Sequence, residues 1–460
     1  MARVRTLFSC IECGAESPKW VGQCPDCAAW NTLEEKSGLP GGPRSSAPVR
    51  SRAQYAGDAG VQELNTVGLA EEARFLTGIG ELDRVLGGGL VQGGVVLLGG
   101  DPGIGKSTLL LQTMAELAAD GRALYVTGEE SMRQVALRAS RLGLSVQGLK
   151  VLAETCVESV VEQALAHKPR VMVIDSIQTI FTEHMQSAPG AVAQVRESAA
   201  QLVRLAKQTG TAIFLVGHVT KDGQLAGPRV LEHMVDTVLY FESDGSSRFR
   251  LLRAVKNRFG AANELGVFAM DESGLREVRN PSAIFLSRHA EAVPGSVIMV
   301  TREGSRPLLL ELQSLVSESP LSNPRRVAVG LEQNRVAMLL AVLHRHGGVF
   351  TADQDVFINV VGGVRVGETA SDLPMLLAAL SSLRDRPIPA DCVVFGEVGL
   401  AGEIRPVPNG EERLREAAKH GFQRAVIPHK NAVKGRREID GLRLVPVKRL
   451  TDAIEAVFEN

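Results

Sequence analysis

The sequence has no long apolar run and no excess of charge of either sign. No uninterrupted apolar stretch in its 460 residues approaches the length of a membrane span, and the N-terminus lacks the basic-then-apolar layout of a signal peptide. We therefore expect a cytoplasmic protein with no membrane partner. Lys and Arg number 51 against 52 Asp and Glu, so the total charge does not indicate a nucleic-acid binder. Such a function has to be argued from local features.

Cysteine is also scarce, and the six that are present are unevenly placed. In a reducing cytoplasm they favour metal ligands or buried thiols over disulfides. Four of them form two C-x-x-C pairs: Cys10, Cys13, Cys24 and Cys27. This spacing predicts a structural zinc site in a C4 zinc finger over residues 1–33, since four sulfurs leave no open position for catalysis. The alternative, cysteines simply buried in a core, is disfavoured because so short a segment needs a staple. Cys156 and Cys392 are expected to be buried thiols.

Composition and periodicity divide the rest of the chain into three parts. Residues 34–60 are rich in Gly, Pro, Ser and Arg, which is typical of a flexible linker. Over 61–285, short apolar runs alternate with helical patterns, which predicts an α/β domain with a parallel sheet. Over 286–460, strands punctuated by Pro and Gly surround long helical patterns, which predicts a separate α+β domain.

One glycine-rich motif in the α/β region carries a specific chemistry. The apolar run 95–99 precedes a match to G-x-x-x-x-G-K-S, and a helical pattern follows it. Such a loop binds a triphosphate with backbone N–H groups, its lysine reaches the β and γ phosphates, and its serine hydroxyl ligates Mg²⁺. The predicted ATP-binding residues are Gly100, Asp101, Pro102, Gly103, Ile104, Gly105, Lys106, Ser107 and Thr108.

Acidic residues at two further strand ends complete the predicted ATPase site. Asp175 ends the apolar run 171–175, where it can hold Mg²⁺ together with Ser107. A helix N-cap is the alternative role for Asp175. Glu129 and Glu130 end another predicted strand, and hydrolysis needs one carboxylate to polarise the attacking water. We favour Glu129 and expect Glu130 to be an acid in the first turn of a helix.

The order of these motifs, followed by Lys256-Asn257-Arg258-Phe259-Gly260, resembles the bacterial RadA (Sms) family of DNA repair proteins over almost the whole chain. The resemblance implies a RecA-like ATPase core in a hexameric ring. In this family the ring moves on single-stranded DNA, acts on branched DNA and promotes branch migration in recombination. A recombinase and other replication or repair proteins are the implied partners.

The resemblance also assigns roles to basic residues. In RecA-like rings a basic pair such as Lys256 and Arg258 reaches the ATP of the neighbouring subunit, where cations stabilise transition-state charge. The alternative is a solvated basic turn. Phe259 is expected either to stack on a base or to pack in an interface, and the sequence leaves both open.

The resemblance to RecA-like folds also indicates a sensor residue and DNA-binding loops. In such folds the end of this strand senses the nucleotide, so His218, which follows the strand 213–217, is a nucleotide-sensor candidate, although a lone histidine is more often structural. The loop beyond it makes Lys221 and Arg229 DNA-contact candidates, and residues 186–190 are a second candidate channel loop. Phosphate contacts from such loops are independent of base sequence and weaken with salt.

The C-terminal region resembles the proteolytic domain of Lon-type proteases, so an ATP-dependent protease is the rival hypothesis. That chemistry needs a serine activated by a lysine. The corresponding positions hold Ala370 and Arg413, and an arginine stays protonated and cannot act as a base. Ser371 is one residue away, about a quarter turn around a helix. We therefore expect an inactive Lon-protease-like domain that serves as a ring and DNA platform.

Two basic runs of this domain are possible DNA contacts. Arg325 and Arg326 form one, and residues 430–437 form the other, although a solvated face is the default interpretation of a charge run. A nucleotide-switched signalling ATPase is a third functional class with the same core. It does not explain a zinc finger joined to an inactive Lon-like domain.

Overall fold

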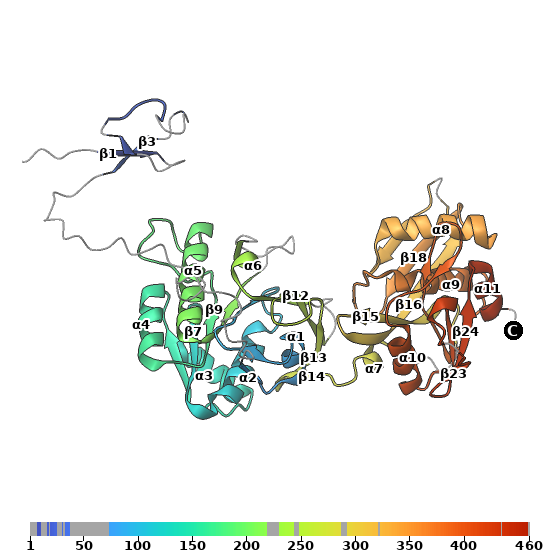
Figure 1. The fold of residues 1–460 in the computed structure, drawn as a ribbon, viewed down its shortest axis with the longest axis horizontal. Helices are drawn as coiled ribbons and strands as arrows, with labels where there is room; N and C mark the ends of the chain where they lie inside the picture. Colours follow the sequence, from blue (N-terminus) through green and yellow to red (C-terminus); the bar gives the residue numbers. More distant parts are fainter. Residues whose placement is uncertain are drawn as a thin grey trace, which may run out of the picture. The chain divides into compact units, whose positions relative to one another are not determined.

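A computed structural model describes residues 7–10, 16–17, 19–24, 30, 33–36, 73–218, 230–242, 248–286, 292–320, 323–433 and 435–458 (Figure 1). The chain separates into two compact units, Met1–Gln54 and Tyr55–Asn460. No helix in the described part of the chain is both long and apolar enough to cross a membrane.

The first unit is built on a small antiparallel sheet with strand order β2-β1-β3. The strands are β1 (Leu7–Cys10), β2 (Glu16–Ser17) and β3 (Leu33–Lys36). Its described apolar core is only Cys24 and Leu33, with Phe8 packed against them. Cys13, Cys27 and the side chain of Cys10 lie outside the described residues, so the predicted zinc site stays a prediction.

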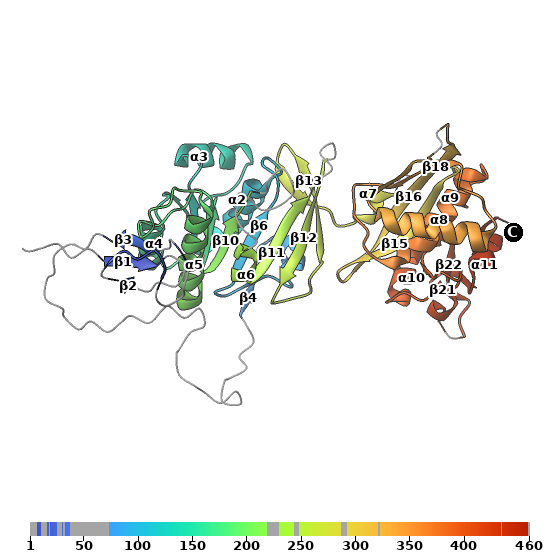
Figure 2. The same cartoon turned by 90° about the horizontal axis from the view of Figure 1, so that it is seen from above.

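The second unit begins with a nine-stranded sheet of order β14-β13-β12-β11-β6-β10-β9-β7-β8 (Figure 2). Its strands from β11 to β8 in that order are parallel, and β12 to β14 form an antiparallel extension. The bounds are β6 (Val95–Gly99), β7 (Ala123–Thr127), β8 (Leu149–Ala153), β9 (Val171–Asp175), β10 (Ala212–Val216), β11 (Thr237–Glu242), β12 (Phe249–Asn257), β13 (Leu265–Asp271) and β14 (Gly274–Glu277). A short pair, β4 (Arg74–Phe75) and β5 (Leu90–Val91), precedes them.

Helices cover both faces of this sheet, which explains why its central strands are apolar throughout. Every residue of β6, β7, β9 and β10 is buried, as expected for parallel strands covered on both sides. One face packs in a core with α1 (Gly80–Val85), α2 (Lys106–Leu117) and α3 (Met132–Arg141). The other packs with α4 (Val157–His167), α5 (Val192–Thr209) and α6 (Val230–Met234).

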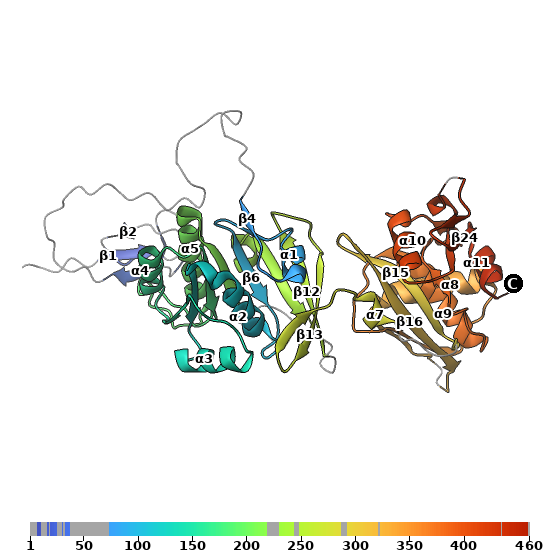
Figure 3. The ribbon, with the colours of Figure 1, turned by 90° about the horizontal axis from the view of Figure 1, so that it is seen from below.

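The C-terminal part of this unit contains a mixed eight-stranded sheet of order β17-β18-β16-β15-β19-β22-β24-β23 (Figure 3). The strands are β15 (Ser296–Glu303), β16 (Arg306–Glu318), β17 (Arg326–Val329), β18 (Gln354–Val360), β19 (Cys392–Val394), β22 (Arg424–Pro428), β23 (Glu438–Ile439) and β24 (Leu442–Val447). A separate pair is β20 (Glu397–Val398) and β21 (Ile404–Arg405). The helices are α7 (Ser282–Phe285), α8 (Gln333–Gly347), α9 (Asp372–Leu383), α10 (Gly410–Lys419) and α11 (Leu450–Phe458). The first ten residues of α9 are all buried, so this helix forms the centre of the domain.

Candidate nucleotide site

The glycine-rich loop lies between the end of β6 and the start of α2. Gly103 and Gly105 have φ angles of 76° and 120°, a region that side chains with a Cβ rarely adopt. A Cβ on Gly105 would also lie 2.7 Å from Cε of Met270. The loop then presents the N-terminus of α2, where unpaired backbone N–H groups favour an anion. This backbone fits the phosphates of a nucleotide.

Lys106 is the first residue of α2, and only 4 % of it is exposed. Its Nζ donates to the carbonyl oxygens of Gly100 (2.7 Å) and Asp101 (2.9 Å) and lies 3.3 Å from Nδ1 of His218. Burial lowers the pKa of Lys106, and the charges of Asp175, Asp101 and Glu129 oppose that shift. The cation is therefore held on the loop beside acidic groups.

The order of the parallel strands brings the predicted residues to one edge of the sheet. Strands β6, β10, β9 and β7 are neighbours, and their carboxyl ends carry Lys106, His218, Asp175 and Glu129 respectively. Carboxyl ends of parallel strands meet at the same edge, which is where ligands bind in open α/β sheets. His218 follows the strand between those of Lys106 and Asp175, so it can contact both the loop and the acids.

The two neighbouring glutamates point to different partners. Oε1 of Glu129 lies 3.1 Å from Nε2 of His218 and accepts a hydrogen bond from the hydroxyl of Ser176. Glu130 forms an ion pair with Arg138 of α3. Glu129 thus belongs to the group at the sheet edge. The prediction that Glu130 lies in the first turn of a helix is wrong, because Glu130 precedes the N-cap residue of α3 and instead pairs with Arg138 near the end of that helix.

Asp175 is buried at the end of β9 and accepts a hydrogen bond from a residue that sequence reasoning missed. The hydroxyl of Tyr125 donates to its Oδ2 over 2.5 Å. Burial raises the pKa of Tyr125 far above its usual range, and the charge of Asp175 adds to the effect. The one sequence signal was a tyrosine between apolar residues of the strand, since a buried hydroxyl needs a partner. The Asp175 carboxylate and the Ser107 hydroxyl are oxygen donors of the kind that Mg²⁺ prefers.

The basic motif after β12 is tied to the preceding helix. Nζ of Lys256 donates to the carbonyl oxygens of Glu232 (2.6 Å) and Val235 (2.8 Å) at the end of α6. Burial lowers the pKa of Lys256, and the neighbouring Arg258 lowers it further. Arg258 has a side chain that is 57 % exposed and pairs with Asp236 at 3.3 Å. Of the two cations, Arg258 is the more accessible.

The other members of the motif pack within the same domain. Phe259 is half-buried, its carbonyl accepts a hydrogen bond from Arg74 (2.7 Å), and its ring centre lies 5.9 Å from Nζ of Lys207. Asn257 Oδ1 accepts the backbone N–H of Phe259 over 3.0 Å. A Cβ on Gly260 would lie 2.8 Å from Cα of Gly87, which explains the glycine.

The DNA-contact candidates are partly described. Lys221 and Arg229 lie outside the described residues. Arg325 is exposed, whereas the guanidinium of Arg326 donates to the carbonyl oxygens of Thr351 (2.6 Å) and Gln354. Arg326 therefore already has protein partners.

One buried side chain, Gln194, holds the second candidate loop and the turn that precedes it. Nε2 of Gln194 donates to the carbonyl oxygens of Thr182 (3.3 Å), Met185 (3.2 Å) and Ser187 (2.8 Å). Glu158 supports the same turn by accepting the hydroxyl of Thr182.

Arg413, which stands at the position of the protease lysine, forms an ion pair with Glu368. Arg413 is 1 % exposed and donates to both carboxylate oxygens of Glu368 (2.8 and 2.6 Å). It also donates to the carbonyl oxygens of Val300 and Pro408. Ala370 and Ser371 are buried, and the Ser371 hydroxyl donates to the carbonyl of Glu368 over 2.9 Å. The guanidinium of Arg413 stays protonated, so it cannot remove a proton from the Ser371 hydroxyl.

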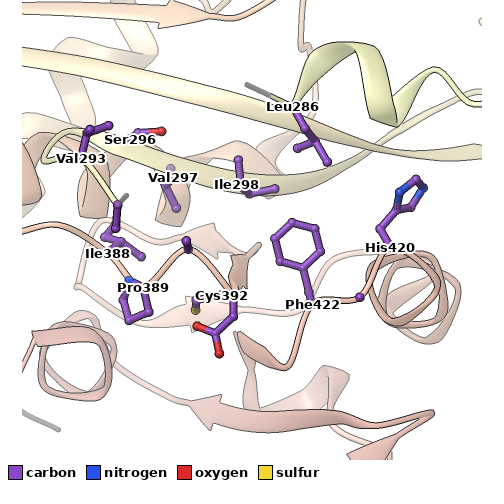
Figure 4. Close-up of a pocket in the computed structure, with 14 residues that line it drawn as sticks. Leu286, Val293, Ser296, Val297, Ile298, Ile388, Pro389, Cys392, His420 and Phe422 are labelled. Carbon is purple, nitrogen blue, oxygen red and sulfur yellow. The ribbon is translucent and has the colours of Figure 1, made fainter. Parts of the chain in front are cut away.

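A cavity of about 440 Å³ in the same domain contains none of the predicted site residues (Figure 4). Leu286, Val297 and Phe422 are among the apolar side chains that line it. Cys392 also lines it, and burial raises the pKa of this thiol to about 12. The thiol therefore stays protonated and is a poor nucleophile.

Comparison with known families gives three matches. Residues 63–224 match a family described as AAA domain, residues 8–35 match a rubredoxin metal binding domain, and residues 326–431 match subunit ChlI of Mg-chelatase. These matches, with the sheets described above, confirm the predicted fold class: an α/β RecA-like core with an N-terminal zinc ribbon and a C-terminal α+β Lon-protease-like domain.

Similar proteins extend over the full chain. It is 64 % identical to the DNA repair protein RadA of Pseudomonas aeruginosa over 461 residues, covering 100 % of both chains. It is 60 % identical to the DNA repair protein RadA of Escherichia coli K12 and 47 % identical to that of Bacillus subtilis, with 99 % of both chains covered in each case.

Proposed function

Because this chain belongs to the RadA family of bacterial DNA repair proteins, we propose that it is a DNA-dependent ATPase that processes recombination intermediates. In this proposal it promotes branch migration by ATP-driven movement on single-stranded DNA, in the cytoplasm. That the chain is an ATPase follows from its AAA domain and its family. The observation that carries the DNA dependence is the contact of His218 with both Lys106 and Glu129.

The nucleotide site has a division of roles. Residues 100–108 hold ATP, with Lys106 on the β and γ phosphates, and Ser107 and Asp175 hold Mg²⁺, which neutralises charge on the phosphates. Glu129 orients the attacking water and accepts its proton. Its contacts with His218 and Ser176 support this role, because both fix the carboxylate at the sheet edge.

His218 connects this site to DNA. It is the last described residue before the segment with Lys221 and Arg229, which we propose to contact the phosphates of single-stranded DNA. A DNA contact on that segment would shift His218 and so change the position of Glu129. Residues 186–190 form a second contact loop. In the C-terminal domain Arg325 is better placed for a phosphate than Arg326, because its side chain is exposed.

The active assembly is a homo-hexameric ring in which Lys256 and Arg258 act on the ATP of the neighbouring subunit. The exposure of Arg258 supports its role as the cation that reaches across. Lys256 holds the end of α6, the helix that follows the DNA-contact segment. A zinc ion on Cys10, Cys13, Cys24 and Cys27 staples the N-terminal unit, which binds a recombinase or another repair protein.

The C-terminal domain is a platform for the ring and for DNA rather than a protease. The buried pair of Arg413 and Glu368 supports this, since it fills the position of the catalytic base with a permanent cation. The rival function, ATP-dependent proteolysis, would need a nucleophile elsewhere.

The test is phosphate release by wild type and Lys106→Ala, each with and without single-stranded DNA, at increasing salt, with casein as a second substrate. We expect single-stranded DNA to stimulate ATP hydrolysis by the wild type, and added salt to weaken that stimulation because phosphate contacts release counterions. Lys106→Ala should not hydrolyse ATP, and casein should stay intact. ATP hydrolysis that is indifferent to DNA, together with cleaved casein, would contradict the proposal and favour the protease.

A further inference from the structure

Tyr125 and Asp175 form a buried pair across two neighbouring strands. Strand β7 pairs in parallel with β9, with Tyr125 opposite Val173 and Thr127 opposite Asp175. The tyrosine ring therefore starts two residues before the strand end and reaches along the sheet to the carboxylate. Its hydroxyl donates to Oδ2 of Asp175 over 2.5 Å.

The environment of Tyr125 fixes the direction of this hydrogen bond. Tyr125 is 1 % exposed and belongs to the core cluster that includes Val135 and Ala139 of α3 and Val173 of β9. A ring enclosed in close-packed side chains has little freedom to turn. The hydroxyl is thus held at the carboxylate by the core and not only by the hydrogen bond.

We propose that Tyr125 is a positioning residue of the magnesium site. Its hydroxyl holds one oxygen of Asp175 and sets the plane of the carboxylate, which leaves the other oxygen for the metal and its water shell. Hydrogen bonds to a metal-ligating carboxylate orient it and raise metal affinity. This inference rests on the proposed function, because it takes Asp175 as a ligand of Mg²⁺.

A structural role alone would predict a different outcome. A buried tyrosine needs some acceptor, and on that account removal of the hydroxyl would weaken folding but not magnesium binding in particular. The chain offers a matched control in Tyr240, whose hydroxyl donates to another carboxylate, Glu232, over 3.1 Å. Glu232 is not part of the proposed metal site.

The experiment measures binding of a fluorescent ADP analogue to the full-length protein, in EDTA and across a titration of MgCl₂. The variants are Tyr125→Phe, Tyr240→Phe, Asp175→Asn and the double variant Tyr125→Phe/Asp175→Asn. We expect Tyr125→Phe to raise the Mg²⁺ concentration for half-maximal effect by about 10- to 100-fold and to leave affinity in EDTA unchanged. Tyr240→Phe should match the wild type, and Tyr125→Phe should add nothing to Asp175→Asn, since it acts through that carboxylate.

A Tyr125→Phe protein with wild-type Mg²⁺ dependence would overturn the inference, as would an equal loss of affinity with and without Mg²⁺. A wild-type protein whose nucleotide binding does not respond to Mg²⁺ would instead contradict the proposed site itself. Circular dichroism of each variant at the assay temperature checks folding. If Tyr125→Phe is unfolded at that temperature, the titration is repeated on all variants at a lower temperature at which it is folded, and the same two outcomes decide.

Discussion

Nε2 of His218 lies 3.1 Å from Oε1 of Glu129, so the proposed sensor and the proposed catalytic base are in direct contact. The other ring nitrogen lies 3.3 Å from Nζ of Lys106. One imidazole therefore spans the lysine of the phosphate loop and the carboxylate that would orient water. Its backbone also leads into the segment proposed to contact DNA, so it connects the proposed DNA contact to the nucleotide site.

This contact predicts that His218 matters more for stimulation by DNA than for basal hydrolysis. In His218→Ala we expect the ratio of DNA-stimulated to basal ATPase activity to fall by about tenfold, comparable to other allosteric couplings of roughly 1–3 kcal/mol. Steady-state phosphate release with and without single-stranded DNA measures the ratio. His167, which is exposed at the C-terminal end of α4, gives a control in His167→Ala. A normal ratio in His218→Ala would remove His218 from the coupling.

The opposite orientations of Glu129 and Glu130 predict opposite consequences for catalysis. We expect Glu129→Gln to lower kcat by about 100-fold or more, because a general base contributes roughly 10²–10⁴, with little change in nucleotide affinity. Glu130→Gln removes the partner of Arg138 and should lower kcat by no more than about fivefold, since a partly exposed ion pair contributes about 1 kcal/mol or less. Single-turnover hydrolysis separates chemistry from binding. The reverse pattern would exchange the roles of the two acids.

The sequence was enough to predict the phosphate loop, the carboxylate for the metal and the strands that carry them. Each of these features requires particular residue types at neighbouring positions of the chain. A positive φ restricts Gly103 and Gly105, and an apolar run that ends in an acid marks Asp175. The contact of Tyr125 with Asp175 could not be predicted, since it depends on β7 lying next to β9 rather than next to β6. Strand order is a property of the whole sheet.

The hydrogen-bond partners of the basic residues could not be predicted from the sequence for the same reason. Arg326 looked equivalent to Arg325 in the sequence, yet its guanidinium donates to carbonyl oxygens of residues 351 and 354. A charge run gives no information on which side chain folds back onto the backbone. Arg413 and Glu368 are likewise 45 residues apart.

The exposure of Arg258 predicts complementation between subunits. We expect Arg258→Ala to lower the DNA-stimulated kcat by at least about 100-fold, as the loss of a cation from a phosphoryl-transfer site does. Mixed with Lys106→Ala at equal amounts, it should regain about a quarter of wild-type activity, since in a randomly mixed ring about one interface in four joins an intact loop to an intact arginine. No recovery on mixing, with ring assembly verified by mass, would mean that Arg258 acts within its own subunit.

Glu158 predicts an acid-sensitive turn beside the second proposed DNA loop. Burial opposes ionisation of this carboxyl, but hydrogen bonds from Thr182, Gln201 and Cys156 prevail and lower its pKa from 4.5 to about 2. Because the folded-state pKa is depressed, the stabilisation is fully present above pH 4.5 and is lost as the pH falls from 4.5 toward 2.

In Glu158→Gln we therefore expect a loss of about 1–2 kcal/mol at neutral pH, after allowance for solvent screening. The difference between variant and wild type should shrink below pH 4.5. Urea unfolding at a series of pH values measures it, with the exposed Glu162→Gln or a similar helix-surface change as control. A difference that does not depend on pH would indicate lost packing rather than lost charge.

The pair of Arg413 and Glu368 predicts that the residue at the position of the protease lysine stabilises the domain. Arg413→Met leaves Glu368 as an uncompensated charge beside a buried apolar side chain, and removing one member of a buried ion pair costs roughly 3–5 kcal/mol. Replacing both partners, as in Arg413→Met/Glu368→Leu, should recover much of that loss, because no charge is then left without its partner. The midpoint of the guanidinium unfolding transition, followed by circular dichroism, reports both effects. If Arg413→Met alone were as stable as the wild type, the pair would contribute nothing to folding. In that case Arg413 would have to be tested for a role in DNA binding, by measuring the DNA affinity of the Arg413→Met variant.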